Sequence, residues 1–441
     1  MDPMVPRSLS SHKRNQQFRG GQPFHGPGLH ATVRTVWIPE FKRARIQGQR
    51  RRNQRTAMTL EADMTKAPQA DTPTVSTKLM QVMTPNGKVV DKKFLASMPQ
   101  EDIVRLYEAM LVQRVYDERM IKMQRQGRLG FYLACTGEEA CAYGPAYALE
   151  DKDWFYPAYR EPGIALWRGM PFQAWVDNMV GNCDDPVKGR QMPVHWTARE
   201  QNIVSISSPV GTQIPQATGS AYASKLRGDG AVSICFFGEG TSSEGDFHVG
   251  LNFAGVWKAP AIFFCRNNGY AISTPYEKTT ATEHIALRAH GYGIRGQVVD
   301  GNDVLAVIKA VREAADWARQ GKGPTLIEAK TYRLAAHSTS DDPKGYRLEK
   351  EEAMWRKRCP IKRLKIWLEK EGLWDDDKEQ ACIEAASDRI IAALQVAESK
   401  PHPELDTMFN EVFADVPDHL RRQHEALQAH LESGTADYQP R

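Results

Sequence analysis

Two short motifs hold the residue types that can bind a phosphorylated ligand through a metal ion. The motif GEG, with Glu239 at its centre, and the asparagine pair that ends at Asn268 are separated by 26 residues. Each motif follows a short apolar run, 231–237 and 261–266, and such runs are typical of buried strands. If one helix joins two parallel strands, both motifs lie at the carboxyl edge of the sheet, where open α/β sheets bind ligands.

The chemistry of these side chains favours a divalent cation held together with a diphosphate. Magnesium prefers oxygen ligands in octahedral geometry, and Glu239, Asn268 and a nearby backbone carbonyl can supply three of them. Diphosphate oxygens and water would supply the rest. The glycines let the backbone approach a ligand, and the start of the following helix favours negative charge. The sequence therefore predicts a magnesium and diphosphate site.

Strands and helices alternate around this site. The predicted strands are 202–207, 231–237, 261–266, 296–300 and 325–331, and the predicted helices are 100–126, 213–225, 243–257 and 303–320. Continuous apolar strands alternating with helices indicate an α/β fold with a mostly parallel sheet and helices on both faces. The chain after residue 345 is charged and predominantly helical, and 405–432 is predicted to be a peripheral arm with breaks at prolines.

The charge is divided unevenly along the chain. The net charge is +4, but residues 1–56 hold twelve Lys and Arg against two acids, so the remaining chain carries −6. A nucleic-acid-binding body would show the reverse, and we expect no nucleic-acid partner. We also expect no membrane span, because no apolar run approaches about 18 residues. The seven cysteines lack C-x-x-C spacing, which favours a reduced interior over disulfides or zinc.

The first 75 residues differ from the rest in composition. They are rich in Arg, Gln, Pro, Gly and Thr and are predicted to be a disordered basic extension. The segment has three interpretations: a solvated extension without a targeting role, a targeting peptide, or a later true start of the chain at Met58 or Met64. The predicted organisation is a disordered extension at 1–75, a ligand-binding α/β domain at 76–395 and a helical C-terminal arm at 396–441.

Longer segments carry a resemblance to a known family. The pattern GEG, 26 residues, then NN resembles the thiamine diphosphate signature of transketolase-like enzymes. The flanking segments 189–196, 207–217, 236–275 and 331–347 resemble the α subunits of branched-chain 2-oxo acid dehydrogenases, and the resemblance runs from about residue 80 to 435. It implies a thiamine-diphosphate-binding fold that acts on branched-chain 2-oxo acids such as 3-methyl-2-oxobutanoate.

The resemblance also implies roles for individual residues. It assigns magnesium to Glu239, Asn268 and the Tyr270 carbonyl. It assigns the bound cofactor to Tyr159, Arg160, Ser208, Val210, Gly240, Thr241, Arg266 and His337, although the family usually has a bulkier apolar residue than Val210. It assigns a structural potassium ion to Ser207, Pro209, Thr212 and Gln213. The catalytic residue that it implies is His337, and Phe131 and Tyr132 are candidates for the substrate pocket.

Ser338 matches a phosphorylation position of mitochondrial relatives. The second such position of the family is Leu348 in this chain, so regulation by phosphorylation is not predicted. A cytoplasmic location of the bacterial type is the first expectation, and the mitochondrial matrix is the alternative.

The implied reaction needs partner chains. Activation of the cofactor requires a glutamate from a second domain, and after residue 350 there is no room for another α/β domain of ordinary size. The resemblance therefore implies two α and two β chains, with the cofactor at an α–β interface, and acyl transfer to the lipoyl group of an acyltransferase core.

Three alternatives stay open. The substrate can be of the pyruvate or acetoin type, although pyruvate dehydrogenase α subunits usually have an acid where this chain has Arg266. A non-catalytic protein that binds RNA through the Arg-rich extension is a second alternative. A hydride-transfer enzyme is a third, but no strand is followed by the G-x-G-x-x-G that it needs.

Overall fold

The computed structural model describes residues 73–434. The predictions for the start of the chain, including its disorder, a targeting role and a later start at Met58 or Met64, lie outside the described residues. No helix within 73–434 is long and apolar enough to cross a membrane.

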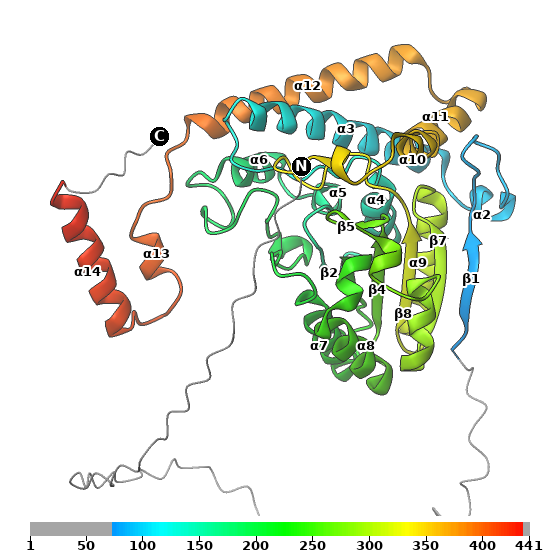
Figure 1. Cartoon of the computed structure of the whole chain (residues 1–441), viewed down its shortest axis with the longest axis horizontal. Helices are drawn as coiled ribbons and strands as arrows, with labels where there is room; N and C mark the ends of the chain where they lie inside the picture. The colour runs from blue at the N-terminus through cyan, green and yellow to red at the C-terminus, as the bar shows by residue number, and fades with distance from the viewer. Residues whose placement is uncertain (1–72, 435–441) are drawn as a thin grey trace, which may run out of the picture. The chain divides into compact units, whose positions relative to one another are not determined.

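A six-stranded sheet forms the centre of the described chain (Figure 1). Its order is β1-β7-β8-β4-β3-β2, and every neighbouring pair is parallel. The strands are β1 (Val75–Met80), β2 (Trp154–Tyr156), β3 (Ser233–Gly238), β4 (Ala261–Asn267), β7 (Arg295–Asp300) and β8 (Thr325–Lys330). A short antiparallel pair, β5 (Tyr270–Ala271) and β6 (Thr274–Pro275), follows β4. The prediction of a mostly parallel sheet is confirmed.

Both faces of the sheet are buried at its centre, where β3 and β4 contain the apolar runs 234–237 and 261–265. In β3, Ile234 and Phe236 belong to one hydrophobic cluster, whereas Cys235 and Phe237 belong to a second cluster on the opposite face. Side chains of a strand alternate between its faces, so a continuous apolar run indicates helices on both sides.

The helices divide between these two clusters. The first cluster includes residues of α3 (Gln100–Arg125), α4 (Glu139–Ala148), α5 (Pro162–Trp167), α6 (Phe172–Val180), α9 (Val304–Arg319), α11 (Pro360–Lys370) and α12 (Asp376–Ser399). The second includes residues of α7 (Gln213–Arg227) and α8 (Gly245–Trp257). Helices α7 and α8 lie side by side, and α12 runs along α3 (Figure 1). The remaining helices are α2 (Lys92–Ala96), α10 (Glu349–Arg356), α13 (Thr407–Asn410) and α14 (Asp418–Glu432).

Local sequence explains where the principal helices begin and end. Helix α9 starts after Asp303, whose carboxylate accepts a hydrogen bond from the Ala306 amide, as a capping residue does. Helix α7 ends at Gly228, which adopts a left-handed conformation that glycine tolerates. The helices predicted at 100–126, 213–225, 243–257 and 303–320 are confirmed to within two residues at most ends.

One predicted strand is wrong. Residues 202–207 form no strand, and only Ile203 makes isolated bridges, to Phe155 and Ala198. The segment does run beside β2, because the Phe155 amide donates to the Asn202 carbonyl and the Val204 amide donates to the Phe155 carbonyl. β2 has only three residues at the edge of the sheet, so it offers too short a ladder for a further strand. The short edge strands β1 and β2 carried no clear periodicity and were not predicted.

Candidate functional site

A cavity of about 240 Å³ lies at the carboxyl ends of β2, β3 and β4 and beside the segment that follows β8. Most of the residues assigned to ligands from the sequence line it: Tyr159, Arg160, Ser207, Val210, Gln213, Glu239, Gly240, Thr241, Arg266, Asn268, Tyr270 and His337. Ser208, Pro209 and Thr212 are not in its lining. The topology thus brings five separated segments together at one edge of the sheet, where ligands bind in such folds.

Glu239 is a buried carboxylate with one oxygen free. It follows β3 and is only 1% exposed. Its Oε2 accepts a hydrogen bond from the backbone N–H of Asn268 at 3.1 Å, whereas Oε1 has no hydrogen-bond partner among the described residues. Burial raises the pKa of Glu239 to about 7. Because an unpaired buried carboxylate is costly, the free oxygen is a ready position for a cation.

The neighbouring glycine permits this arrangement. A Cβ at Gly240 would lie 2.5 Å from the Cβ of Ala271 in β5. The turn after β3 and the strand pair after β4 can therefore approach each other only if residue 240 lacks a side chain.

The two asparagines have different environments. Asn267 donates to Glu328 Oε1 at 2.7 Å and points away from the cavity lining. Asn268 lines the cavity, and its Nδ2 lies 3.3 Å from both carboxylate oxygens of Glu138. A carboxylate only accepts hydrogen bonds, so the amide nitrogen must face Glu138. The Oδ1 atom then faces away and accepts from the Tyr270 amide at 3.2 Å.

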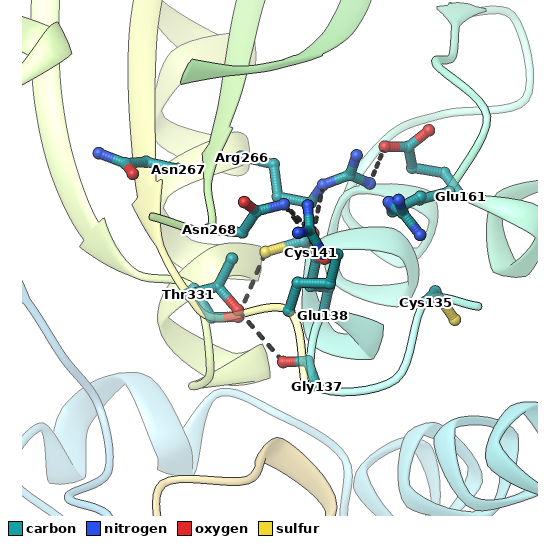
Figure 2. Close-up of polar contacts among 12 residues, drawn as sticks. Cys135, Gly137, Glu138, Cys141, Glu161, Arg266, Asn267, Asn268 and Thr331 are labelled. Carbon is teal, nitrogen blue, oxygen red and sulfur yellow. Dashed lines mark hydrogen bonds and ion pairs between the residues drawn. The ribbon is translucent and has the colours of Figure 1, made fainter. Parts of the chain in front are cut away.

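Arg266 lies between two buried carboxylates (Figure 2). It is 3% exposed, forms an ion pair from Nη1 to Glu161, and its Nε lies 2.6 Å from Glu138 Oε2. The second contact is an ion pair without hydrogen-bond alignment. Burial opposes the charge of Arg266, but the two carboxylates outweigh it and raise its pKa. The guanidinium therefore remains a cation at the cavity wall.

Glu138 reaches this position from the N-terminus of α4. The preceding Gly137 has φ +96°, and a Cβ there would lie 2.5 Å from the Tyr332 carbonyl oxygen. Only glycine permits that approach. Thr331 donates from its hydroxyl to the Gly137 carbonyl at 3.2 Å, which joins this turn to the segment after β8.

His337 is held in one protonation state by two arginines. Its Nδ1 lies 3.0 Å from Arg160 Nη2 and 3.4 Å from Arg333 Nη1. Burial and the charges of these arginines lower the pKa of His337 to about 3. A guanidinium only donates hydrogen bonds, so Nδ1 must accept. The ring is therefore neutral, with its proton on Nε2.

The predicted potassium residues form one loop before α7. The hydroxyls of Ser207 and Thr212 both donate to the Pro209 carbonyl, each at 3.2 Å. Gln213 donates to the Phe236 carbonyl at 2.9 Å, while its Oε1 is buried without a hydrogen-bond partner among the described residues. Ser208 turns from the cavity and makes a 2.9 Å hydrogen bond with His195 Nε2.

The remaining candidates lie outside this cavity. Tyr132 is buried and donates to Asp117 Oδ1 at 2.8 Å, and it shares a separate small cavity with Ser338 and Thr339. Phe131 is half-buried against the core, and Leu348 is exposed.

Three site residues were missed from the sequence: Glu138, Glu161 and Arg333. Arg333 lies three residues after β8, so its place at the end of a strand could have indicated it. Glu161 directly follows the predicted Arg160. Glu138 carried no signal, because it lies at the N-terminus of a helix 130 residues before Asn268.

Comparison with known proteins gives a consistent result. The family model described as "Dehydrogenase E1 component" matches residues 107–406. The 2-oxoisovalerate dehydrogenase subunits alpha, mitochondrial, of Mus musculus and Homo sapiens are each 43% identical over 356 residues, which are 80% of this chain and 80% of each relative. The Caenorhabditis elegans protein of the same name is 41% identical over 82% of this chain and 84% of its own length. These names give no support to the expected cytoplasmic location and fit the mitochondrial alternative.

Proposed function

Because the chain belongs to the family of dehydrogenase E1 components, we propose that it is the α subunit of a thiamine-diphosphate-dependent dehydrogenase of branched-chain 2-oxo acids. The relatives are named as α subunits of 2-oxoisovalerate dehydrogenase. The observation that carries the proposal is the free, buried carboxylate oxygen of Glu239 in a cavity that three arginines also line. An anionic ligand that brings its own divalent cation satisfies both features.

The residues present fit magnesium. Glu239 offers an unpartnered buried oxygen, and Asn268 offers an amide oxygen from the neighbouring strand. The Tyr270 carbonyl, which accepts a 3.3 Å hydrogen bond from Arg333, is the third proposed ligand. Among residues 73–434 no group of three or more His, Cys, Asp or Glu forms a metal site. A set of mixed oxygen ligands completed by phosphate suits magnesium.

The arginines supply the charge that a diphosphate needs. Arg160 and Arg266 are buried in the cavity wall, and guanidinium groups match phosphate oxygens in geometry. Tyr159 lies beside Arg160, and Gly240 and Thr241 present the turn after β3. We assign these five residues to the cofactor, with Ser208 and Val210 placed nearer to its aminopyrimidine ring.

His337 is assigned to catalysis because its proton is on the nitrogen that the arginines leave free. The Nε2–H can donate to an oxygen of the substrate or of the diphosphate, and the low pKa keeps the ring neutral. When bound, thiamine diphosphate supplies the electron sink for loss of carbon dioxide. The chain's own residues bind, orient and donate hydrogen bonds.

A potassium ion is the proposed occupant of the loop before α7. The Pro209 carbonyl and the hydroxyls of Ser207 and Thr212 converge there, and Gln213 adds a buried, unpartnered oxygen. Such oxygens suit a hard monovalent cation, which would fix the loop that carries Ser208 and Val210.

An α subunit of an E1 component works with a β subunit and an acyltransferase core. Exposed apolar side chains on α8, a helix that begins beside the cavity, support a partner chain. Val249, Phe253 and Val256 on α8 are 50%, 44% and 70% exposed, and they lie on one side of the helix by their spacing. Val210 and Ile272 are exposed at the cavity rim. We propose two α and two β chains, with the cofactor between them and acyl transfer to a lipoyl group.

The relatives' names favour a mitochondrial location for this chain as well. We propose the mitochondrial matrix as its compartment. Fractionation of the source cells tests this assignment, and recovery of the protein in the cytosol alone would contradict it.

The substrate assignment is tested by decarboxylation with an artificial electron acceptor. The complex of this chain with its β partner should prefer 3-methyl-2-oxobutanoate to pyruvate in kcat/KM, and activity should require both thiamine diphosphate and magnesium. A preference for pyruvate would retain the cofactor and overturn the substrate. Absence of magnesium-dependent cofactor binding would overturn the proposal as a whole.

A further inference from the structure

Glu138 contacts two residues of the site at once, although it lies outside the cavity lining. Its carboxylate is 2.6 Å from Arg266 Nε and 3.3 Å from Asn268 Nδ2 (Figure 2). It is only 1% exposed, so water cannot replace either contact. Arg266 is the proposed diphosphate ligand and Asn268 is the proposed magnesium ligand.

We propose that Glu138 is a positioning residue that sets the orientation of the Asn268 amide and so selects oxygen, rather than nitrogen, as the atom offered to magnesium. The inference rests on the proposed function, because it concerns the proposed metal site. An amide side chain can turn by 180° and exchange its oxygen and nitrogen positions at little cost in shape. Only its hydrogen-bond partners decide between the two orientations.

The electrostatics favour one orientation. The carboxylate of Glu138 only accepts hydrogen bonds, and it forms an ion pair with the adjacent Arg266. It therefore accepts from Asn268 Nδ2 and repels Oδ1. The Tyr270 amide, which donates to Oδ1 at 3.2 Å, supports the same orientation. Groups that orient metal ligands in this way typically change metal affinity about 10- to 100-fold when they are replaced.

A single substitution at residue 138 reverses the hydrogen-bonding preference for Asn268 and keeps the shape of the side chain. Glu138→Gln has one accepting oxygen, but Arg266 and Asn268 both present donors to it. The positively charged guanidinium of Arg266 attracts the side-chain oxygen of the new glutamine. The NH₂ group of the glutamine then faces Asn268. Asn268 must then turn its own oxygen toward residue 138 and its nitrogen toward the metal position. We expect magnesium affinity to fall about 10- to 100-fold.

A second substitution should restore the site. In the double variant Glu138→Gln with Asn268→Asp, the glutamine amide donates to a carboxylate whose two oxygens are equivalent. One oxygen accepts from residue 138 and the other faces the metal position, so no orientation has to be chosen. The total charge of the pair is also conserved. We expect magnesium affinity within about threefold of the wild type, as coupling between neighbouring residues predicts.

The chain provides a matched control. Glu328 is also buried, and its carboxylate accepts from the amide of Asn267 at 2.7 Å. This pair has the same chemistry one residue before Asn268, but Asn267 does not line the cavity. Glu328→Gln should therefore leave magnesium affinity unchanged, whatever it does to stability.

The experiment is calorimetric titration of magnesium into the α–β complex at saturating thiamine diphosphate. If the wild type shows no magnesium-dependent binding, the proposed function fails. If the wild type binds and Glu138→Gln binds equally well, the positioning role is overturned. An equal loss in Glu328→Gln, or no recovery in the double variant, would also overturn it. If Glu138→Gln fails to assemble, recovery of assembly and binding in the double variant supports the pair, and failure of both variants contradicts it.

Discussion

At the scale of single residues, the arrangement around His337 decides which of its two ring nitrogens carries a proton. Two guanidinium groups face Nδ1 and exclude a proton from that atom. The same charges, added to burial, keep the ring neutral far below its ordinary pKa of 6.5. His337 is therefore a hydrogen-bond donor through Nε2, and it does not act as a cation at neutral pH.

Replacement of His337 should reduce turnover more than cofactor binding. His337→Ala removes the Nε2 donor, and such groups contribute about 10²- to 10⁴-fold to rate. We expect kcat to fall by about 100-fold or more, while the dissociation constant of thiamine diphosphate changes only a few-fold, because both arginines remain. Steady-state kinetics and a binding titration on the α–β complex measure the two effects. Equal loss in both would assign His337 to binding alone.

Protons compete with magnesium for the carboxylate of Glu239, the proposed ligand, and this competition makes magnesium affinity depend on pH. Burial raises the pKa of this carboxyl group to about 7, so below that pH a proton occupies the group that magnesium needs. Magnesium affinity should therefore rise with pH up to about 7 and become constant above it. Below that point the apparent dissociation constant should change tenfold per pH unit. Titrations between pH 5.5 and 8.5 check this, and a flat profile would exclude Glu239 as a ligand.

The sequence predicted those residues that follow long buried strands. Glu239 and Asn268 stand at the ends of β3 and β4, where the apolar runs indicate both the strand and the edge at which it ends, whereas Arg266 was assigned only through the resemblance. Glu138 could not be predicted in this way. Its contact with Asn268 depends on how α4 packs against the sheet, and this packing leaves no periodic signal near residue 138.

At the scale of elements, the site depends on a close contact between the turn after β3 and the strand pair β5–β6. Gly240 makes that contact possible, since any Cβ there would overlap the Ala271 side chain. The parallel pairing of β3 with β4 brings both segments to the same edge. The crossover from β3 through α8 to β4 thus positions the proposed metal ligands Glu239 and Asn268.

Gly240→Ala should separate these segments. A forced overlap in a packed region costs about 1–3 kcal/mol, so we expect lower thermal stability and weaker cofactor binding. Gly245→Ala is the control, because its Cβ would meet nothing within 4 Å at the start of α8. Thermal unfolding followed by circular dichroism compares the two variants. Equal stability of both would show that the contact at residue 240 adapts without cost.

Element prediction succeeded in the centre of the sheet and failed at its edge. β3, β4, β7 and β8 are almost fully buried, and the apolar runs that this burial requires, longest in β3 and β4, make them recognisable. β2 has three residues and pairs with only one full strand, so it has too little apolar sequence to detect. The segment 202–207 was predicted to be a strand, but Ile203 alone makes bridges to neighbouring residues.

At the scale of the whole molecule, the exposed apolar side of α8 indicates that the described chain is one part of an assembly. Val249, Phe253 and Val256 are separated by four and three residues, and each is at least 44% exposed. Apolar groups gathered on one face commonly mark protein–protein interfaces. Their helix begins close to the cavity, which Gly240 and Glu244 line from the preceding turn.

Phe253→Glu should prevent assembly with the β partner without unfolding the α chain. The side chain is exposed, so a charge there costs little in the free chain but is expensive at a buried interface. Val396→Glu on α12, 46% exposed in the native chain, is the control and should assemble normally. Size-exclusion chromatography with light scattering distinguishes the species. Normal assembly of Phe253→Glu would place the interface elsewhere.

The most direct test of the account is release of labelled carbon dioxide from carboxyl-labelled 3-methyl-2-oxobutanoate. The α chain, the β partner and their mixture are each assayed with thiamine diphosphate and magnesium. The account predicts release only from the mixture, because the proposed diphosphate and metal ligands on this chain form only part of the site. Full release by the isolated α chain would contradict the shared site, and no release by a verified complex would contradict the proposed reaction.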